Sequence, residues 1–191
     1  MNKSLHTIMY LLLAVTSGIA GYLLFQSRYA PESAEIPAHL SSARGHASMV
    51  GLMRPDFSLP DLEGRQHVPG EWSGKILVLN FWATWCPPCL QEIPAFIRLQ
   101  EKYASRDVQF VGIALQKAEE VRDFVITKGI NYPILTGEAE VIGVAEAYGN
   151  SIGALPYTVI IDQAQRIAFI KRGPLPESEA ERVISSLVVV K

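Results

Sequence analysis

The feature that most constrains the fold is an apolar run at residues 76–82, interrupted only by Asn80, which ends shortly before the chain's only two cysteines, Cys86 and Cys89. A second apolar run spans residues 108–115. Strands without alternating polar and apolar residues are buried on both faces, as in sheets covered by helices on either side. The two runs therefore predict a layered α/β structure.

The remaining patterns place helices and strands around these runs. Alternation near residues 57–59, followed by turn-forming residues at 61–65, predicts an N-terminal hairpin. We expect helices at residues 87–103, 119–128, 139–148 and 176–188, strands at 157–162 and 167–171, and a short extended segment at 132–135. Because a strand–helix–strand order is followed by a hairpin, the sheet should be mixed, parallel at first and antiparallel at the end.

The N-terminal part of the chain has a different character. Residues 8–25 carry no formal charge, and about 20 apolar helical residues cross a bilayer. We therefore expect an uncleaved membrane anchor at residues 1–27, a flexible tether at 28–52 and a folded domain at 53–191. A weak charge bias, with Lys3 before the run, favours export of the domain. A cleaved signal peptide is the alternative, and it exports the domain as well.

Charge and cysteine content narrow the function classes. The formal net charge of −2 is not that of a nucleic-acid-binding surface, so no nucleic acid partner is expected. An exported domain lies in an oxidising compartment. If the two cysteines act there as a dithiol, something must keep them reduced.

The two cysteines form a Cys-x-x-Cys motif where a strand meets a helix. Unpaired backbone N–H groups and the positive end of the helix dipole favour a thiolate there, so Cys86 should titrate below the value of about 8.5 of a free cysteine. Pro87 and Pro88 suit a first helical turn. Cys89 follows one turn after Cys86 on the same face, close enough to form a disulfide.

This arrangement predicts thiol–disulfide exchange. Cys86 attacks a substrate disulfide to form a mixed disulfide, which Cys89 then resolves. The same steps run backwards, so a disulfide oxidase or isomerase remains open beside a reductase. The redox-active Cys86–Cys89 disulfide is expected to act without a bound cofactor.

Metal binding is the other common use of a Cys-x-x-Cys pair. A structural zinc site needs four ligands, and this chain has no second cysteine pair. Its four histidines are divided between the predicted anchor, the tether and the hairpin, so no zinc ligand set is expected. Two soft thiolates also bind Cu(I), and a copper carrier therefore remains an alternative.

The residues around the cysteine pair resemble a known family. Residues 79–89 (Leu-Asn-Phe-Trp-Ala-Thr-Trp-Cys-Pro-Pro-Cys) and 154–158 (Ala-Leu-Pro-Tyr-Thr) are similar to the membrane-anchored thioredoxin-like proteins of the TlpA/ResA type. The cytochrome c maturation thioredoxin CcmG is a near relative. The resemblance covers residues 53–188 and implies a thioredoxin-like fold with a central insertion at residues 116–147.

The resemblance also implies roles for two residues near the pair. It makes Pro156 a cis-proline that exposes the backbone of Leu155 for strand-like pairing with a substrate peptide. It matches Glu92 to an acidic residue beside the dithiol, which could pass a proton to or from Cys89. The alternative for Glu92 is a solvated carboxylate on the helix surface.

Other residues near the pair are expected to contact the substrate, namely Trp85, Pro87, Pro88 and Leu155. A purely core role is the alternative for Trp85. Asn80 stands where ordinary thioredoxin carries a buried aspartate. Because an amide does not titrate, help with proton transfer must come from elsewhere, and Glu92 is the candidate.

The resemblance implies a place in the cell and a set of partners. It implies a single-pass protein of the inner (cytoplasmic) membrane whose catalytic domain lies on the periplasmic side. The expected activity is reduction of protein disulfides in apocytochrome c or in an oxidase copper-site protein, with electrons from a membrane thiol transporter of the CcdA/DsbD type. Peroxiredoxins share the fold, but they carry a Thr-x-x-Cys motif in place of this dithiol.

Overall fold

The computed structural model describes Tyr22, Leu24, Phe25 and residues 49–188, and the chain divides into two units, Met1–Ala47 and Ser48–Lys191. The three described residues of the first unit are helical. The rest of the predicted anchor, and the tether up to residue 48, lie outside the described residues. Among those that are described, no helix combines the length and apolar character needed to cross a membrane.

Residues 49–52, which the sequence assigned to the tether, pack on the folded domain. The Gly51 N–H donates to the Ile167 carbonyl at 2.7 Å, and the Ile167 N–H donates to the Leu52 carbonyl at 2.9 Å. Met53 forms an antiparallel bridge with Arg166. The described residues directly before Met53 are therefore bonded to the folded domain.

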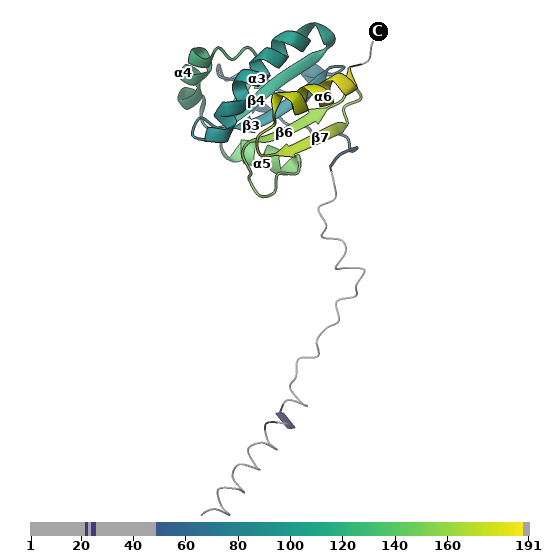
Figure 1. The fold of residues 1–191 in the computed structure, drawn as a ribbon. Coiled ribbons are helices and arrows are strands. Elements are labelled where there is room, and N and C mark those ends of the chain that lie inside the picture. The colour runs from purple at the N-terminus through teal and green to yellow at the C-terminus, as the bar shows by residue number, and fades with distance from the viewer. Residues whose placement is uncertain (1–21, 23, 26–48, 189–191) are drawn as a thin grey trace, which may run out of the picture. The chain divides into compact units, whose positions relative to one another are not determined.

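The centre of the domain is a five-stranded mixed sheet (Figure 1). Its order is β5–β4–β3–β6–β7, and the strands span Ile134–Gly137, Val108–Leu115, Ile76–Trp82, Tyr157–Ile161 and Ile167–Arg172, respectively. β3 is parallel to β4 and antiparallel to β6, and β4 is parallel to β5. The predicted change from parallel to antiparallel pairing is confirmed, and it falls at β3, the strand that leads to the cysteines.

The other elements lie close to their predicted positions. The helices are α3 (Pro87–Tyr103), α4 (Ala118–Lys128), α5 (Ala139–Ala147) and α6 (Glu177–Leu187), with 3-10 turns η2 (Pro69–Trp72) and η3 (Ala104–Arg106). β1 (Leu59–Pro60) and β2 (Gln66–His67) form the predicted N-terminal hairpin. The segment with α4, β5 and α5 comes between β4 and β6, and it adds β5 to the sheet edge.

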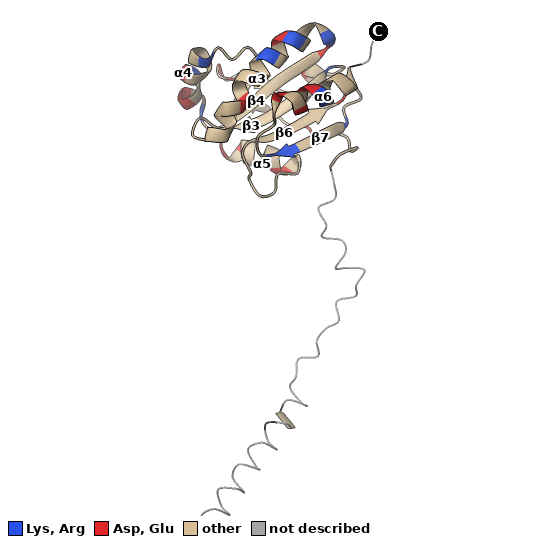
Figure 2. Cartoon of the chain, in the orientation of Figure 1, with Lys and Arg blue, Asp and Glu red and all other residues tan. Residues whose placement is uncertain are grey.

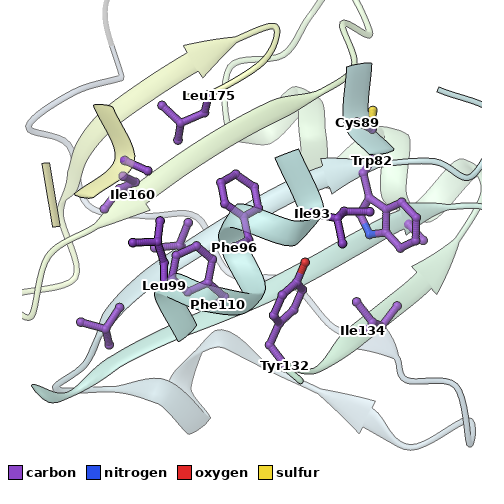
Figure 3. Packing of buried hydrophobic residues seen from close by; sticks show 14 of the residues in the cluster. Trp82, Cys89, Ile93, Phe96, Leu99, Phe110, Tyr132, Ile134, Ile160 and Leu175 are labelled. Atoms are coloured by element: carbon purple, nitrogen blue, oxygen red, sulfur yellow. The ribbon is translucent and has the colours of Figure 1, made fainter. Parts of the chain in front are cut away.

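Two hydrophobic clusters cover the two faces of the sheet. The even-numbered residues Ile76, Val78 and Trp82 of β3 pack with α3 and α6, and this cluster holds both cysteines. Figure 3 shows its aromatic residues between α3 and β4. The odd-numbered residues of β3 pack with α5 and with the N-terminal hairpin. This division confirms that helices cover both faces.

Charged residues lie mainly on the helices and at the end of β7 (Figure 2). The strands β3, β4, β5 and β6 contain no Lys, Arg, Asp or Glu. One charged residue close to the cysteines is buried, and it belongs to α3, on the side of the helix that faces the sheet. This residue, Glu92, is described with the site below.

Candidate redox site

Cys86 and Cys89 form a disulfide at the start of α3, where the chain has just left β3. Their Cα atoms are 5.3 Å apart, which is an ordinary separation for bonded cysteines. Cys86 is the N-cap residue of the helix. Cys86 is 5% exposed and Cys89 is fully buried, so Cys86 is the one cysteine of the pair that reaches solvent.

The first turn of α3 has fewer free N–H donors than the sequence suggested. Pro87 and Pro88 carry no N–H group, and the Cys89 N–H donates to the Cys86 carbonyl at 3.0 Å. The N–H of Cys86 itself donates to the Ala83 carbonyl at 3.2 Å. The helix dipole is therefore the feature of this turn that still favours a thiolate on Cys86.

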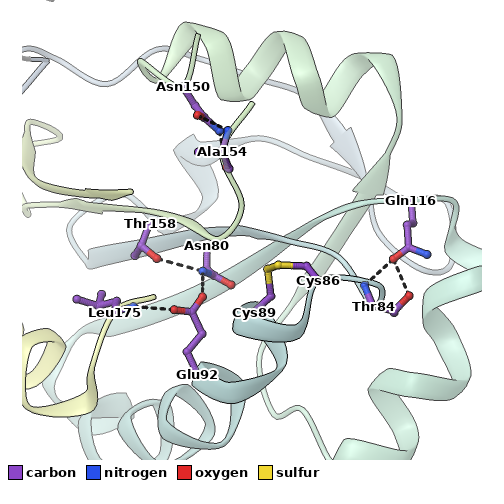
Figure 4. Close-up of a disulfide and its surroundings, with 10 residues drawn as sticks. All are labelled: Asn80, Thr84, Cys86, Cys89, Glu92, Gln116, Asn150, Ala154, Thr158 and Leu175. Carbon is purple, nitrogen blue, oxygen red and sulfur yellow. Dashed lines mark hydrogen bonds between the residues drawn. A yellow bond between two sulfur atoms is a disulfide. The ribbon is translucent and has the colours of Figure 1, made fainter. Parts of the chain in front are cut away.

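Glu92 is buried beneath the disulfide rather than solvated on the helix surface, with an exposed fraction of 4%. The Asn80 amide donates to Glu92 Oε1 at 2.7 Å and also to Thr158 Oγ1 at 3.0 Å. The Leu175 N–H donates to Glu92 Oε2 at 2.9 Å. Figure 4 shows the carboxylate and Cys89 projecting to the same side of α3.

All of these donors to Glu92 are neutral, and no ion pair within the described residues involves this carboxylate. Burial raises the pKa of Glu92 to about 7, and the hydrogen bonds from Leu175 and Asn80 only partly oppose that effect. A surface cavity of about 180 Å³ lies against Glu92 and Leu175. Glu92 is thus an acid near neutral pH, placed between the dithiol and a cavity at the surface.

The peptide bond between Leu155 and Pro156 is cis, the isomer that the family resemblance implied. Leu155 packs against the cluster that contains both cysteines. Within residues 49–188, neither the N–H nor the carbonyl of Leu155 has a hydrogen-bond partner. Both groups are therefore available to another chain. Pairing in the sheet resumes beyond the proline, with Tyr157 opposite Phe81.

The two tryptophans near the pair have different surroundings. Trp82 is buried, and its ring lies 5.5 Å from that of Phe124. Trp85, directly before the first cysteine, is 62% exposed. A side chain of this size in contact with solvent beside a disulfide is typical of a binding surface. The geometry thus disfavours the core alternative for Trp85.

Two residues that the sequence analysis did not select also belong to this region. Gln116 lies directly after β4 and contacts Thr84, and Asn150 lies after α5 and contacts Ala154. Both are buried polar residues beside apolar segments. That position was the one sequence signal that could have drawn attention to them.

In the parts of the chain that the structure describes, no group of three or more His, Cys, Asp and Glu residues is arranged to hold a metal ion. The two sulfurs would be the ligands of any Cu(I). In the present geometry they are bonded to each other. The arrangement is that of a disulfide exchange site with an acid beside it.

Comparisons with known proteins agree with this chemistry. Residues 49–184 match the protein family described as Redoxin. The chain is 33% identical over 142 residues to the thiol-disulfide oxidoreductase ResA of Geobacillus thermodenitrificans, covering 74% of this chain and 79% of that protein. It is 36% identical over 136 residues to the thioredoxin-like protein YneN of Bacillus subtilis, covering 69% and 76%.

A solved structure has the same architecture. It is a thiol:disulfide interchange protein of the thioredoxin family from Chlorobium tepidum, with a TM-score of 0.65 and 31% sequence identity. The match covers 72% of this chain and 96% of that one. The shared fold is therefore thioredoxin-like.

Proposed function

Because this chain belongs to the Redoxin family and is a thiol-disulfide oxidoreductase of the ResA type, we propose that it reduces protein disulfides outside the cytoplasm through Cys86 and Cys89. One observation carries the proposal. The side chain of Leu155 packs against the cluster that holds the cysteine pair, while its backbone N–H and carbonyl are unpaired, so an extended peptide paired with Leu155 would present its disulfide to Cys86.

The first step is attack by the Cys86 thiolate on one sulfur of the substrate disulfide. A bond forms between Cys86 and that sulfur while the substrate S–S bond breaks, and the departing sulfur leaves as a thiolate that takes up a proton. Cys86 is assigned this role because it is the more exposed cysteine of the pair. Trp85, Pro87 and Pro88 flank it and contact the substrate in this proposal.

The second step is attack by Cys89 on the Cys86 sulfur. The Cys86–Cys89 bond forms, the mixed disulfide breaks, and the substrate leaves with two electrons more than it brought. Cys89 must lose its proton, and it is fully buried. Glu92 lies on the same face of α3 as Cys89, and in its ionised form it accepts the proton of Cys89. A pKa of about 7 suits proton transfer near neutral pH.

The partners and location are proposed on less direct grounds. The uncharged run at residues 8–25 supports a membrane anchor with the catalytic domain on the periplasmic side. The resemblance to ResA-type proteins supports apocytochrome c or an oxidase copper-site protein as substrate. Because the oxidised dithiol must be reduced again in an oxidising compartment, a membrane thiol transporter of the CcdA/DsbD type is the proposed electron donor.

Two cysteine variants of the full chain test the chemistry. Cys86→Ser should abolish disulfide reduction, because the attacking sulfur is gone. Cys89→Ser should trap the substrate as a mixed disulfide at Cys86, visible as a mass increase that dithiothreitol removes. The double variant controls for noncovalent adducts. Reduction by Cys86→Ser at the native rate would disprove the mechanism.

The reduction potential of the Cys86–Cys89 couple decides the direction. A value near that of thioredoxin, about −270 mV, means a reductant. A value near that of DsbA, about −120 mV, means an oxidant, and it would replace the proposed reductase by the oxidase or isomerase. Tight stoichiometric Cu(I) binding, together with no exchange activity, would instead indicate a copper carrier.

A further inference from the structure

Two loops flank the Cys86–Cys89 disulfide, and each is held by a buried side-chain amide (Figure 4). The first loop, residues 83–86, joins β3 to α3 and carries Cys86. The second loop, residues 149–155, joins α5 to the cis-proline and ends at Leu155. Gln116 holds the first loop and Asn150 holds the second.

Gln116 binds the first loop through a single oxygen. Its Oε1 accepts the Thr84 N–H at 2.7 Å and the Thr84 hydroxyl at 2.8 Å. Its amide nitrogen donates to Glu120 Oε2 at 3.2 Å. Because a carboxylate only accepts hydrogen bonds, Glu120 fixes the orientation of the amide with its oxygen toward Thr84. The Gln116 carbonyl accepts the Gly137 N–H, so its backbone is anchored to β5.

Asn150, near the start of the second loop, forms two hydrogen bonds with the backbone of Ala154 near its end, the pairing that a neighbouring strand would make. Its Nδ2 donates to the Ala154 carbonyl at 2.9 Å, and its Oδ1 accepts the Ala154 N–H at 2.9 Å. Its own N–H donates to the Ala145 carbonyl of α5 at 2.9 Å. Asn150 is only 1% exposed. Through these bonds it connects α5 to Ala154, the residue before Leu155.

Packing holds the second loop mainly at its end, where Leu155 contacts both hydrophobic clusters. A small apolar cavity of about 40 Å³ lies between α5 and this loop, and Asn150, Gly153 and Leu155 are among its lining residues. Ile152, at the middle of the loop, is 72% exposed. Because few side chains of this loop are buried, the paired amide of Asn150 is the main link between Ala154 and the domain.

We propose that Gln116 and Asn150 are positioning residues with separate tasks: Gln116 sets the geometry of the attacking cysteine, and Asn150 sets the geometry of the backbone that binds the substrate peptide. The inference rests on the proposed function, because it assumes that Cys86 attacks and that Leu155 pairs with the peptide. Neither residue touches the reacting sulfurs, so each acts through the loop it holds.

The test for Gln116 uses the reduced full chain in mild detergent and a single turnover, so that no external reductant takes part. Gln116→Met keeps the side-chain length but cannot accept from Thr84. Attack on hydroxyethyl disulfide should slow by roughly tenfold, about the effect of one lost hydrogen bond to a buried group. The equilibrium with glutathione should also move by roughly tenfold, which is about 30 mV for a two-electron couple.

Two further variants make this result specific. Thr84→Val removes the hydroxyl and keeps the N–H, so it should produce a smaller change in the same direction. Gln109→Met is the matched control, since Gln109 lies on β4 and bonds to Gln100 and Phe110. It should leave the rate and the equilibrium unchanged. An unchanged equilibrium with glutathione for Gln116→Met would overturn the role of Gln116.

The test for Asn150 compares a small disulfide with a peptide. Asn150→Leu removes both bonds to Ala154 at similar volume. The concentration at which a short synthetic peptide disulfide saturates the reduced protein should rise by roughly tenfold, near the lower end of the effect of two lost hydrogen bonds. The rate with hydroxyethyl disulfide and the equilibrium with glutathione should not change, because the first loop is intact. Asn150→Asp, which still accepts the Ala154 N–H, should recover part of the peptide affinity.

Asn131→Leu is the matched control for Asn150. The amide of Asn131 donates to the Ile97 carbonyl at 3.1 Å on an exposed part of the molecule. If Asn150→Leu slowed both substrates equally, its role would be general stability, and the proposed division of tasks would be wrong. Failure of the unsubstituted protein to reduce either disulfide would instead overturn the proposed function.

Discussion

Glu92 and Asp61 are carboxylates with similar exposed fractions, 4% and 6%, but Glu92 lies deeper in the protein, and their pKa values move in opposite directions. The pKa of Glu92 is raised to about 7 by burial. Burial also favours a higher pKa for Asp61, but hydrogen bonds from His67, from two backbone N–H groups and from the Arg65 side chain outweigh it and lower the pKa to about 2. The depth of burial and the type of donor therefore together decide which of the two carboxylates holds a proton.

The two sites serve different purposes in the domain. Asp61 closes the N-terminal hairpin, and it forms an antiparallel bridge with Leu135 of β5. Its charge is compensated by Arg65 at 2.9 Å, as expected of a structural ion pair. Glu92 lies beside the dithiol with neutral partners only, so its charge costs free energy whenever it is present. A carboxylate left in that state is suited to exchanging protons.

Among the substitutions that test this contrast, Glu92→Gln should have the largest effect on stability. Because the folded pKa of about 7 lies above the ordinary 4.5, the folded protein binds more protons than the unfolded chain between these values. Stability should therefore fall as the pH rises from about 4.5 to 7, by about 3 kcal/mol in total. Glu92→Gln should remove this slope. Denaturant unfolding of the oxidised protein across that range measures it, and an unchanged slope would contradict the raised pKa.

The pH dependence of stability that Asp61→Asn removes should have the opposite sign to that removed by Glu92→Gln. The lowered pKa of Asp61 means that its stabilisation is present above the ordinary value of 3.8 and is lost as the pH falls toward about 2. At pH 7 the variant should be less stable by about 1–2 kcal/mol, because Arg65 and His67 lose their anionic partner. Thermal unfolding at pH 7 and pH 3 measures this, and the deficit should shrink at the lower pH. An equal deficit at both would show that charge is not the cause.

His67→Gln should give the smallest effect. The pKa of His67 is raised, first by its hydrogen bond to Glu71 and then by that to Asp61, although burial opposes both. Its contribution is complete below about pH 6.5 and is lost as the pH rises through the folded value. Because the pair with Glu71 is partly solvated, we expect less than about 1 kcal/mol. The stability difference from the native protein should be larger at pH 6 than at pH 9, and a reversed order would contradict the raised pKa.

Local sequence patterns were enough to predict most elements. The helix expected at residues 87–103 is α3, Pro87–Tyr103, and the strand expected at 108–115 is β4, Val108–Leu115. Both are bounded by residues with strong local preferences, prolines at the start of α3 and a left-handed Asp107 before β4. The attachment of Gly51 and Leu52 to the domain was not predictable in this way, because their backbone bonds to Ile167 depend on no particular side chain.

The parts of the site that come from one continuous segment of the chain could be predicted from the sequence. The cysteine pair and the exposed Trp85 follow from adjacent residues. The burial of Glu92 did not, because one of its donors, the Leu175 N–H, lies 83 residues further along the chain. Gln116 and Asn150 were missed for a related reason, since an amide shows its purpose only when the backbone groups it binds are known.

The unequal exposure of the two cysteines also bears on the order of events in the proposed catalytic cycle. Cys89 is fully buried and Cys86 is 5% exposed, so a thiol of the proposed electron donor would attack at Cys86, the same residue that is proposed to attack the substrate. Two proteins cannot be covalently attached to one sulfur at once. Donor and substrate must therefore alternate, and the steady-state kinetics should be ping-pong.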